Sequence, residues 1–274
     1  MSAPATPAGP TEDGRGAWSA AALGGLAVAE VRKTLSTHAW WVLLVAAAAI
    51  TLLSSLVTAE IGGLAFTASM AQATTLSGIG TKFTVLFGVV SAASEYRHRT
   101  ITTSYLTASG RPQLVVAKAA VAAAVGAVYG VVCAIAGVLG VLFGGGQFDS
   151  EFGAVLGVSL AAVLLYALWA ALGVGIGTLV NNQLAAIVGV LIYLILVEQI
   201  LVLLARAADL GQIDGYLPAG ASEAVLTGLA GEGPFGGLFS TQTLPWGAAL
   251  LIFAGYTAAA LLAGVAVAQR RDIT

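Results

Sequence analysis

Two ionisable residues, Lys82 and Glu198, lie inside long apolar stretches of the sequence. A charge at the middle of a membrane-spanning helix costs about 2.5 to 3.5 kcal/mol, so such residues usually have a functional role. Lys82 precedes Glu95, and Glu198 follows Gln183, where Glu95 and Gln183 mark the same edge of the apolar layer. At about 1.5 Å per helical residue, Lys82 and Glu198 both lie about 20 Å from that edge. We hypothesise an intramembrane polar pair, or a common polar cavity. The alternative is that Lys82 extends to the interface and Glu198 is protonated or capped by a neighbouring helix.

The sequence lacks the motifs that would support catalysis. Gly78 to Lys82 reads GIGTK, without the GK[ST] ending of a nucleotide-binding loop. His38 and His98 have no His or Cys partner at metal-ligand spacing, and no HExxH sequence occurs. Cys133 is the single cysteine, which excludes an internal disulfide and a cysteine-based metal site. We therefore expect no enzyme, no metal site and no cofactor bound by this chain.

The richest polar segment extends from Glu95 to Lys118. Its basic residues fit an anchor on the cytoplasmic side of a membrane. That interpretation does not account for the carboxylate of Glu95 at the membrane edge. It also leaves unexplained residues 100–106, which suit a short helix ended by Gly110 and Pro112.

The elements around these residues follow from composition. Of 274 residues, 58% are hydrophobic and 9% are charged, whereas soluble domains contain about 25% charged residues. Too few polar residues remain to cover a water-facing surface, so we expect a membrane protein. Six apolar segments are long enough to cross about 30 Å of hydrocarbon. They are residues 40–58, 74–94, 114–143, 152–180, 184–204 and 246–268.

The distribution of basic residues predicts how these segments cross. Lys and Arg accumulate on the cytoplasmic side of membrane proteins. With six crossings and both termini in the cytoplasm, only Lys82 and Arg206 of the 11 basic residues lie toward the outside. Lys82 interrupts the second segment, and failure of that segment to cross would invert everything after it. We predict an all-α polytopic protein of a bacterial inner membrane with six transmembrane helices.

The remaining segments flank or connect the spans. Residues 18–39 suit an amphipathic helix lying in the interface, or else an extension of the first span. Residues 206–245 are rich in Gly and Pro but too apolar for a free loop, and we expect a capping or re-entrant element with a short helix at 219–229. The predicted organisation is a disordered tail at 1–17, the interfacial helix at 18–39, the transmembrane domain at 40–268 and a cytoplasmic tail at 269–274.

Glycines at four-residue spacing permit close approach of helices. We expect them to pack helices within the chain, with a contact between two copies as the alternative. The pairs are Gly126 and Gly130, Gly140 and Gly144, Gly153 and Gly157, and Gly173 and Gly177.

The polar segment resembles a loop of the ABC-2 type ABC transporter permeases. In that family the loop follows the pattern E-x-x-x-G-T, leucine, P-x-x-R, A-K. The matching residues are Glu95, Arg99-Thr100, Leu106, Arg111 and Ala117-Lys118. Arg99 replaces the usual glycine, and Pro112 follows the arginine in place of the proline that usually leads the turn.

The resemblance implies the permease subunit of an ATP-driven transporter, more often an exporter. It implies a second permease copy or a paralogue, and a separate cytoplasmic ATP-binding subunit that carries the ATP and Mg²⁺. The almost wholly apolar spans favour a hydrophobic or amphipathic cargo. A non-transporting anchor or regulator is the alternative, and the absence of a basic tract argues against nucleic acid. The expected contacts with the ATPase are Glu95, Arg97, Arg99, Thr100, Leu106 and Arg111 in the loop, and Glu30, Arg32 and Lys33 in the interfacial helix.

Overall fold

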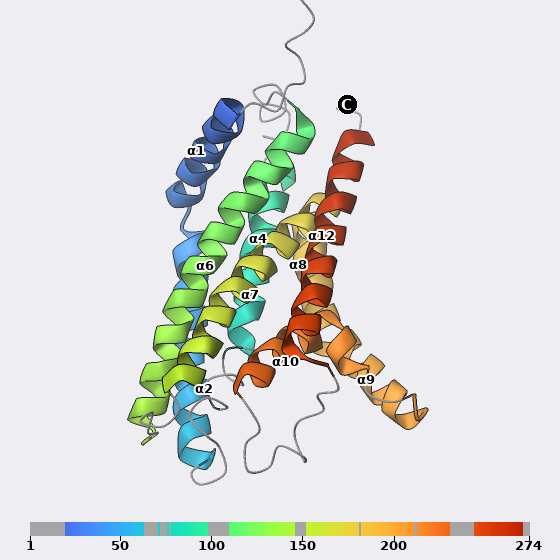
Figure 1. Ribbon diagram of the computed structural model, residues 1–274. Helices are drawn as coiled ribbons and strands as arrows, with labels where there is room; N and C mark the ends of the chain where they lie inside the picture. Colours follow the sequence, from blue (N-terminus) through green and yellow to red (C-terminus); the bar gives the residue numbers. More distant parts are fainter. Residues whose placement is uncertain are drawn as a thin grey trace, which may run out of the picture.

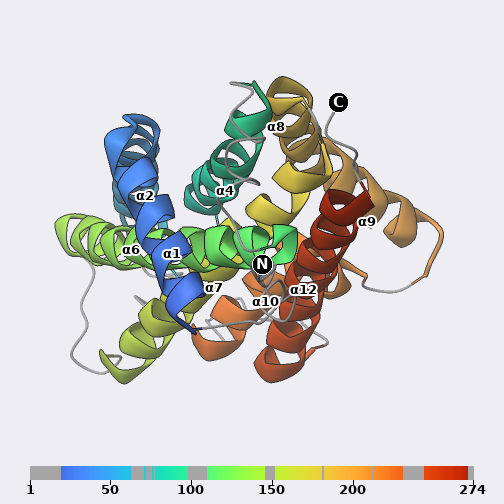
Figure 2. The ribbon, with the colours of Figure 1, turned by 90° about the horizontal axis from the view of Figure 1, so that it is seen from above.

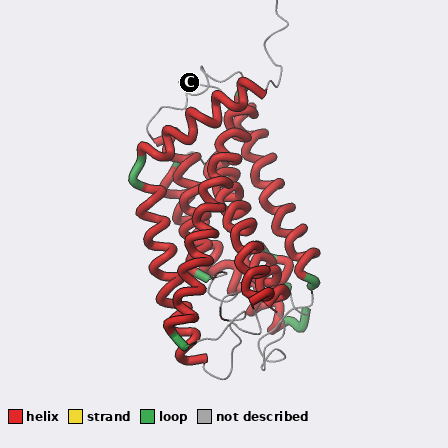
Figure 3. The backbone as a smooth tube through the Cα atoms, turned by 60° about the vertical axis from the view of Figure 1, so that its left-hand side comes forward, coloured by secondary structure: helices red, strands yellow, loops and turns green. Residues whose placement is uncertain are grey.

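The computed structural model describes residues 20–62, 71, 76, 78–97, 110–145, 152–180, 182–210, 213–230 and 244–270, with backbone only for 20–22, 61–62, 95–97 and 111. Within these ranges the chain is helical and contains no strand (Figure 3). In chain order the elements are α1 (Ala20–Ser36), α2 (Ala39–Gly62), α4 (Ile79–Arg97), α6 (Arg111–Phe143), α7 (Phe152–Leu179), α8 (Gln183–Ile192), the π-helix η2 (Tyr193–Val197), α9 (Glu198–Ala207), the 3₁₀-helix η3 (Asp214–Tyr216), α10 (Pro218–Ala230) and α12 (Trp246–Arg270).

Five helical segments of the described chain are long and apolar enough to cross a membrane. They are Ala39–Glu60, Pro112–Phe143, Phe152–Leu179, Gln183–Ala207 and Trp246–Arg270. The sixth predicted segment, 74–94, is not among these five, and residues 74, 75 and 77 lie outside the described residues. The described helix there begins at Ile79, and its apolar part, Ile79–Ser94, is shorter than the other five.

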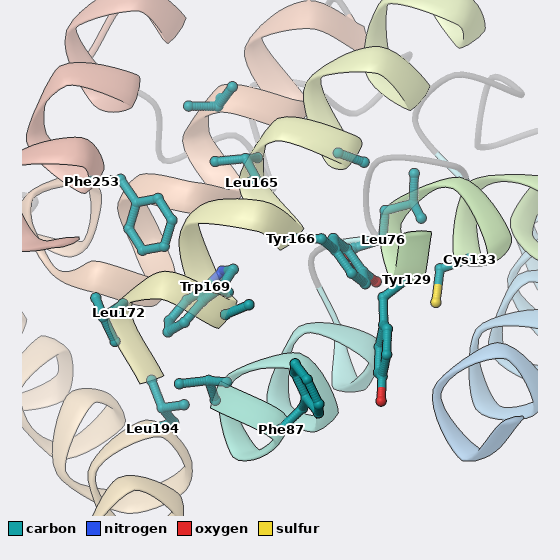
Figure 4. Packing of buried hydrophobic residues seen from close by; sticks show 14 of the residues in the cluster. Leu76, Phe87, Tyr129, Cys133, Leu165, Tyr166, Trp169, Leu172, Leu194 and Phe253 are labelled. Carbon is teal, nitrogen blue, oxygen red and sulfur yellow. The ribbon is translucent and has the colours of Figure 1, made fainter. Parts of the chain in front are cut away.

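Helix α7 lies at the centre of the bundle. It packs against α6, α4, α12 and α10, as the view from above shows (Figure 2). Trp169 on α7 is 1% exposed and its ring lies 4.8 Å, between centroids, from that of Phe253 on α12 (Figure 4). Tyr166 on the same helix donates a hydrogen bond to the carbonyl oxygen of Leu76 at 3.1 Å. Large aromatic rings therefore fill the middle of the bundle, and glycines bring the helices together around them.

Three of the four glycine pairs lie against another helix, a different one in each case. A Cβ at Gly173 would lie 2.3 Å from the carbonyl oxygen of Val85 on α4, and one at Gly126 would lie 2.5 Å from that of Tyr166. Gly140 faces α2 in the same way. Packing within the chain is thus confirmed for three of the pairs. The fourth, Gly153 and Gly157, has nothing within 4 Å of an added Cβ.

Replacing Gly88 with alanine is expected to destabilise the bundle. An added Cβ there would lie 2.1 Å from the carbonyl oxygen of Ala170, so α4 and α7 must separate. We expect a loss of about 1 to 3 kcal/mol, the usual range for overpacking. Apparent melting temperatures in mild detergent measure it, with Gly157→Ala as the matched control because that position is open. Equal temperatures for the two variants would mean that this close contact is absent.

Helix α1 is separate from the first long helix. The chain bends at Thr37 and His38, so α1 is not a straight extension of α2 (Figure 1). The hydroxyl of Thr37 donates to the carbonyl oxygen of Thr34 at 2.9 Å, at the end of α1. Helix α1 packs against α6.

The fifth long apolar segment is one helix with a π-helical interruption. It begins at Asn182, whose side chain accepts hydrogen bonds from the N–H groups of Leu184 and Ala185 at 2.9 and 3.2 Å. This is a typical N-cap. Helix α9, beyond η2, diverges from the bundle in Figure 1. The chain then returns through η3 to α10, which confirms the short helix predicted at 219–229.

Candidate functional site

The carboxylate of Glu198 holds the beginning of α10. Glu198 is 2% exposed, and its Oε1 accepts hydrogen bonds from the N–H groups of Ala219 at 2.9 Å and Gly220 at 3.0 Å. The first N–H groups of a helix have no acceptor within that helix, and a negative charge is favourable there. Leu217, which precedes α10, has no side-chain acceptor. A residue from another helix therefore supplies the cap.

The π-helix η2 positions this carboxylate. The N–H of Glu198 bonds to the carbonyl oxygen of Tyr193, five residues earlier, which is the π-helical pattern. Because the turn is widened, Glu198 lies on the helix face that carries Tyr193 and Leu194. Interruptions of this type are frequent at functional sites. Nothing in the local sequence signals this one.

Helix α10 lies close against the 3₁₀-helix that precedes it. A Cβ at Gly220 would lie 1.9 Å from the carbonyl oxygen of Asp214, so only glycine fits at this contact. The Asp214 carboxylate in turn lies 3.7 Å from the guanidinium of Arg206 at the end of α9. The 3₁₀-helix η3 is thus held against α10, at the same end of the bundle as Glu198.

Lys82 belongs to the same polar region. Its Nζ donates to the carbonyl oxygen of Gly78 at 3.0 Å. The ammonium lies within electrostatic range of the carboxylates of Glu223, on α10, and Glu198. Direct pairing of Lys82 with Glu198 stays a hypothesis, because the hydrogen bonds of the Glu198 carboxylate go to α10. Capping by a neighbouring helix is the alternative that the sequence left open for this residue.

The sequence analysis did not single out Glu223 as part of this region. Its side chain keeps an exposed face, yet desolvation by the surrounding protein raises the pKa of its carboxyl. The Lys82 ammonium opposes this rise, and the Asp214 carboxylate adds to it. Glu223 lies in the short helix that the sequence predicts after Glu198, five residues after Pro218. That position is the signal from which Glu223 could have been found.

An apolar cavity of about 310 Å³ adjoins the polar region. It lies between α7, the α8 and η2 segment, the beginning of α10 and α12. Known sites for small molecules have volumes of about 300 to 1,000 Å³. Trp169, Leu172 and Leu194 are seen together in Figure 4. Residues that line the cavity include Trp169, Leu172, Val190, Leu194, Pro218 and Ala260.

No protein-family model matches the chain, and no curated protein matches its sequence. The geometry of the polar region and of the cavity therefore carries the functional interpretation. Within the described ranges, no three His, Cys, Asp or Glu side chains gather as metal ligands.

A second polar contact lies at the opposite end of the bundle. Glu30 on α1 and Lys118 on α6 form a buried ion pair with 2.6 Å between Oε2 and Nζ. The two side chains are 8% and 4% exposed. Sequence reasoning assigned Glu30 to a contact with a partner, whereas the structure buries its carboxylate against α6. The available signal was Lys118, a lone ammonium in an apolar run, since buried charges need partners.

The other residues predicted to contact the ATPase differ in their exposure and in whether the structure describes them. Arg32 is exposed on α1, and Lys33 beside it is partly buried. Glu95 and Arg97 lie in the last turn of α4, and Arg111 begins α6, with only their backbone described. Both helix ends lie at the same end of the bundle as α1 (Figure 1). Outside the described residues are Arg99, Thr100 and Leu106.

Proposed function

We propose that the chain is the permease subunit of an ATP-driven transporter of the ABC-2 type. It exports a hydrophobic or amphipathic compound and is energised by a separate cytoplasmic ATP-binding subunit. The observation that carries the proposal is an apolar cavity that adjoins a polar region within a bundle of apolar helices. The resemblance of the loop around Glu95 and Arg111 to that family supports the same conclusion.

In this proposal the chain crosses a bacterial cell membrane six times, with both termini in the cytoplasm. Support for the sixth crossing comes from the packing of α4 against α7 and α2 inside the bundle. Its 19 residues correspond to about 28 Å at the rise of an α-helix, close to the thickness of the hydrocarbon layer. Lys82 lies near one end of α4, where its long side chain can reach the interface.

The coupling surface in this proposal consists of α1 and the adjoining ends of α4 and α6. The Glu30–Lys118 ion pair fixes α1 to α6. A force that the ATPase applies to α1 would therefore move α6 as a rigid body, and with it α7, which packs on α6. A second permease subunit completes the transporter, and the exposed apolar side chains of α9, such as Leu203 and Leu204, are available to contact it or lipid.

Affinity purification of the tagged chain in mild detergent tests this function. The wild-type protein is expected to recover an ATPase from the cells in which it is natively expressed. The double variant Glu95→Ala/Arg111→Ala is expected to lose it. Ala208→Ser, at an exposed position of the opposite end of the bundle, is the matched control and should retain it. If intact wild-type protein recovers no ATPase under any condition, a non-transporting anchor or regulator is the better interpretation.

A further inference from the structure

The apolar cavity opens sideways between α8 and α12. Ala185 and Gly189 on α8 and Tyr256 on α12 line it and are exposed. The two helices pack elsewhere, α8 mainly against α4 and α12 mainly against α7. Beside the mouth, the large apolar side chains of Leu184 and Val188 are 69% and 44% exposed. Because α8 and α12 belong to segments apolar enough to cross a membrane, this mouth would face the hydrocarbon of a bilayer.

The floor of the cavity, in contrast, is buried in the bundle. Trp169 and Leu172 on α7 and Leu194 on η2 line it (Figure 4). Each of these side chains is at most 6% exposed. Pro218, the first residue of α10, lines the cavity as well. The cavity therefore has an open side, an apolar floor and a helix end across it.

The length of the cavity matches one leaflet of a membrane. Its α7 wall extends from Trp169 to Val180, which corresponds to about 16 Å at about 1.5 Å per residue. Val180 belongs to the turn between α7 and α8, and a turn that joins two spans lies at a membrane surface. The cavity thus extends from that surface to near the middle of a hydrocarbon layer of about 30 Å.

The width of the cavity suits a single alkyl chain. About 310 Å³ spread over about 16 Å corresponds to a mean cross-section of about 19 Å². An α-helix is about 10 Å across with its side chains, so a helix of a second copy does not fit. The volume has room for about ten groups of the size of a water molecule or a methylene, at about 30 Å³ each.

The chemistry of the lining also favours an apolar occupant. Among the described residues, no charged side chain lines the cavity. Its polar groups are the indole of Trp169 and the hydroxyls of Tyr193 and Tyr256. The Tyr256 hydroxyl already donates to the carbonyl oxygen of Tyr216 at 2.9 Å. A charged or strongly polar compound would therefore lose its hydration here without gaining partners.

We propose that the cavity binds one acyl chain of a membrane phospholipid, which enters sideways between α8 and α12. The headgroup stays at the membrane surface beside the turn between α7 and α8, and the end of the chain reaches Trp169. In the proposed topology this lipid belongs to the cytoplasmic leaflet. The site does not depend on the proposed transport function, because binding requires only this chain in a bilayer.

Quenching of Trp169 fluorescence by brominated lipid tests the proposal, because bromine quenches an indole only at short range. Trp169 is 1% exposed, so the bulk bilayer does not reach it. The full chain, with phenylalanine in place of the other four tryptophans, is placed in phosphatidylcholine nanodiscs. The lipid is brominated either near the end of its acyl chain or near the carbonyl group. We expect several-fold stronger quenching by bromine at the chain end.

Two glycine variants test the choice of cavity. Gly189→Leu should remove most of the quenching, because Gly189 lines the cavity and an added Cβ meets nothing within 4 Å. Gly157→Leu adds the same bulk at another open position and should leave the quenching unchanged. If the single-tryptophan variant folds poorly, the difference in emission between the wild type and Trp169→Phe gives the same readout.

Three results would overturn the proposal. They are no quenching of Trp169 in the intact protein, equal quenching by bromine at the two positions, and quenching that Gly189→Leu does not reduce. The transport function fails separately. Quenching in a chain that recovers no ATPase would remove the function and leave the site, whereas recovery of the ATPase without quenching would do the reverse.

Discussion

Replacing Glu198 with alanine is expected to lower the free energy of unfolding by about 2 to 4 kcal/mol. The change leaves the buried N–H groups of Ala219 and Gly220 without an acceptor and removes the negative charge from the beginning of α10. Local sequence cannot compensate, because Leu217 has no acceptor side chain. The apparent melting temperature in mild detergent measures the loss.

Glu198→Gln is the matched control for this prediction. Its amide oxygen can accept the same two hydrogen bonds, so most of the stability should remain. Hydrogen exchange of the peptide that spans α10 shows whether the effect is local. Fast exchange is expected in the alanine variant and slow exchange in the glutamine variant and the wild type. Identical exchange of α10 in all three proteins would show that the carboxylate does not hold this helix.

Replacing Lys118 with methionine is expected to cost about 3 to 5 kcal/mol, the usual result of removing one partner from a buried ion pair. The carboxylate of Glu30 would remain buried between α1 and α6 without a cation. The double variant Glu30→Met/Lys118→Met should recover most of this loss, because two apolar side chains of similar size need no partner. Melting temperatures of the single and double variants measure the coupling.

An exposed charge on the same helix is the control for the ion pair. Arg32→Met should change stability by less than about 0.5 kcal/mol, because Arg32 is exposed on α1. If Lys118→Met were no more harmful than Arg32→Met, or if the double variant were as unstable as the single one, the buried pair would not fix α1 to α6.

The long helices could be predicted from the sequence because their signals are local. The apolar run at 152–180 matches α7 almost to the residue, and the run at 246–268 matches α12 within one turn. The short helix α10 was also predictable, since Pro218 is favourable in the first turn of a helix. In each case, hydrophobic composition and flanking Gly or Pro residues suffice.

The contacts that define the candidate site are not local, and the sequence did not reveal them. Glu30 and Lys118 are separated by 88 positions, and Glu198 lies 21 positions from Ala219. The sequence showed the charges of these residues and how far each lies along its apolar segment. The position of a charge along a segment does not identify the residue that it contacts. The π-helix before Glu198 has no composition signal, because its residues, YLILV, suit an α-helix equally well.

The second apolar segment shows a different limit. Its first half is mildly polar, and the sequence could define neither where the helix begins nor whether it crosses. The structure begins α4 at Ile79 and packs it against α7. The side of the membrane on which each later element lies depends on this one helix.

Cysteine labelling tests most directly the claim that the coupling surface and both chain termini share one side of the membrane. In a Cys133→Ala background, single cysteines replace the exposed residues Ser36, Ala208 and Gln269. A membrane-impermeant maleimide is added to spheroplasts before or after lysis. Six crossings predict labelling of Ala208→Cys in intact spheroplasts, and of Ser36→Cys and Gln269→Cys only after lysis. Labelling of Ser36→Cys and Gln269→Cys from opposite sides would show an odd number of crossings and would contradict the account.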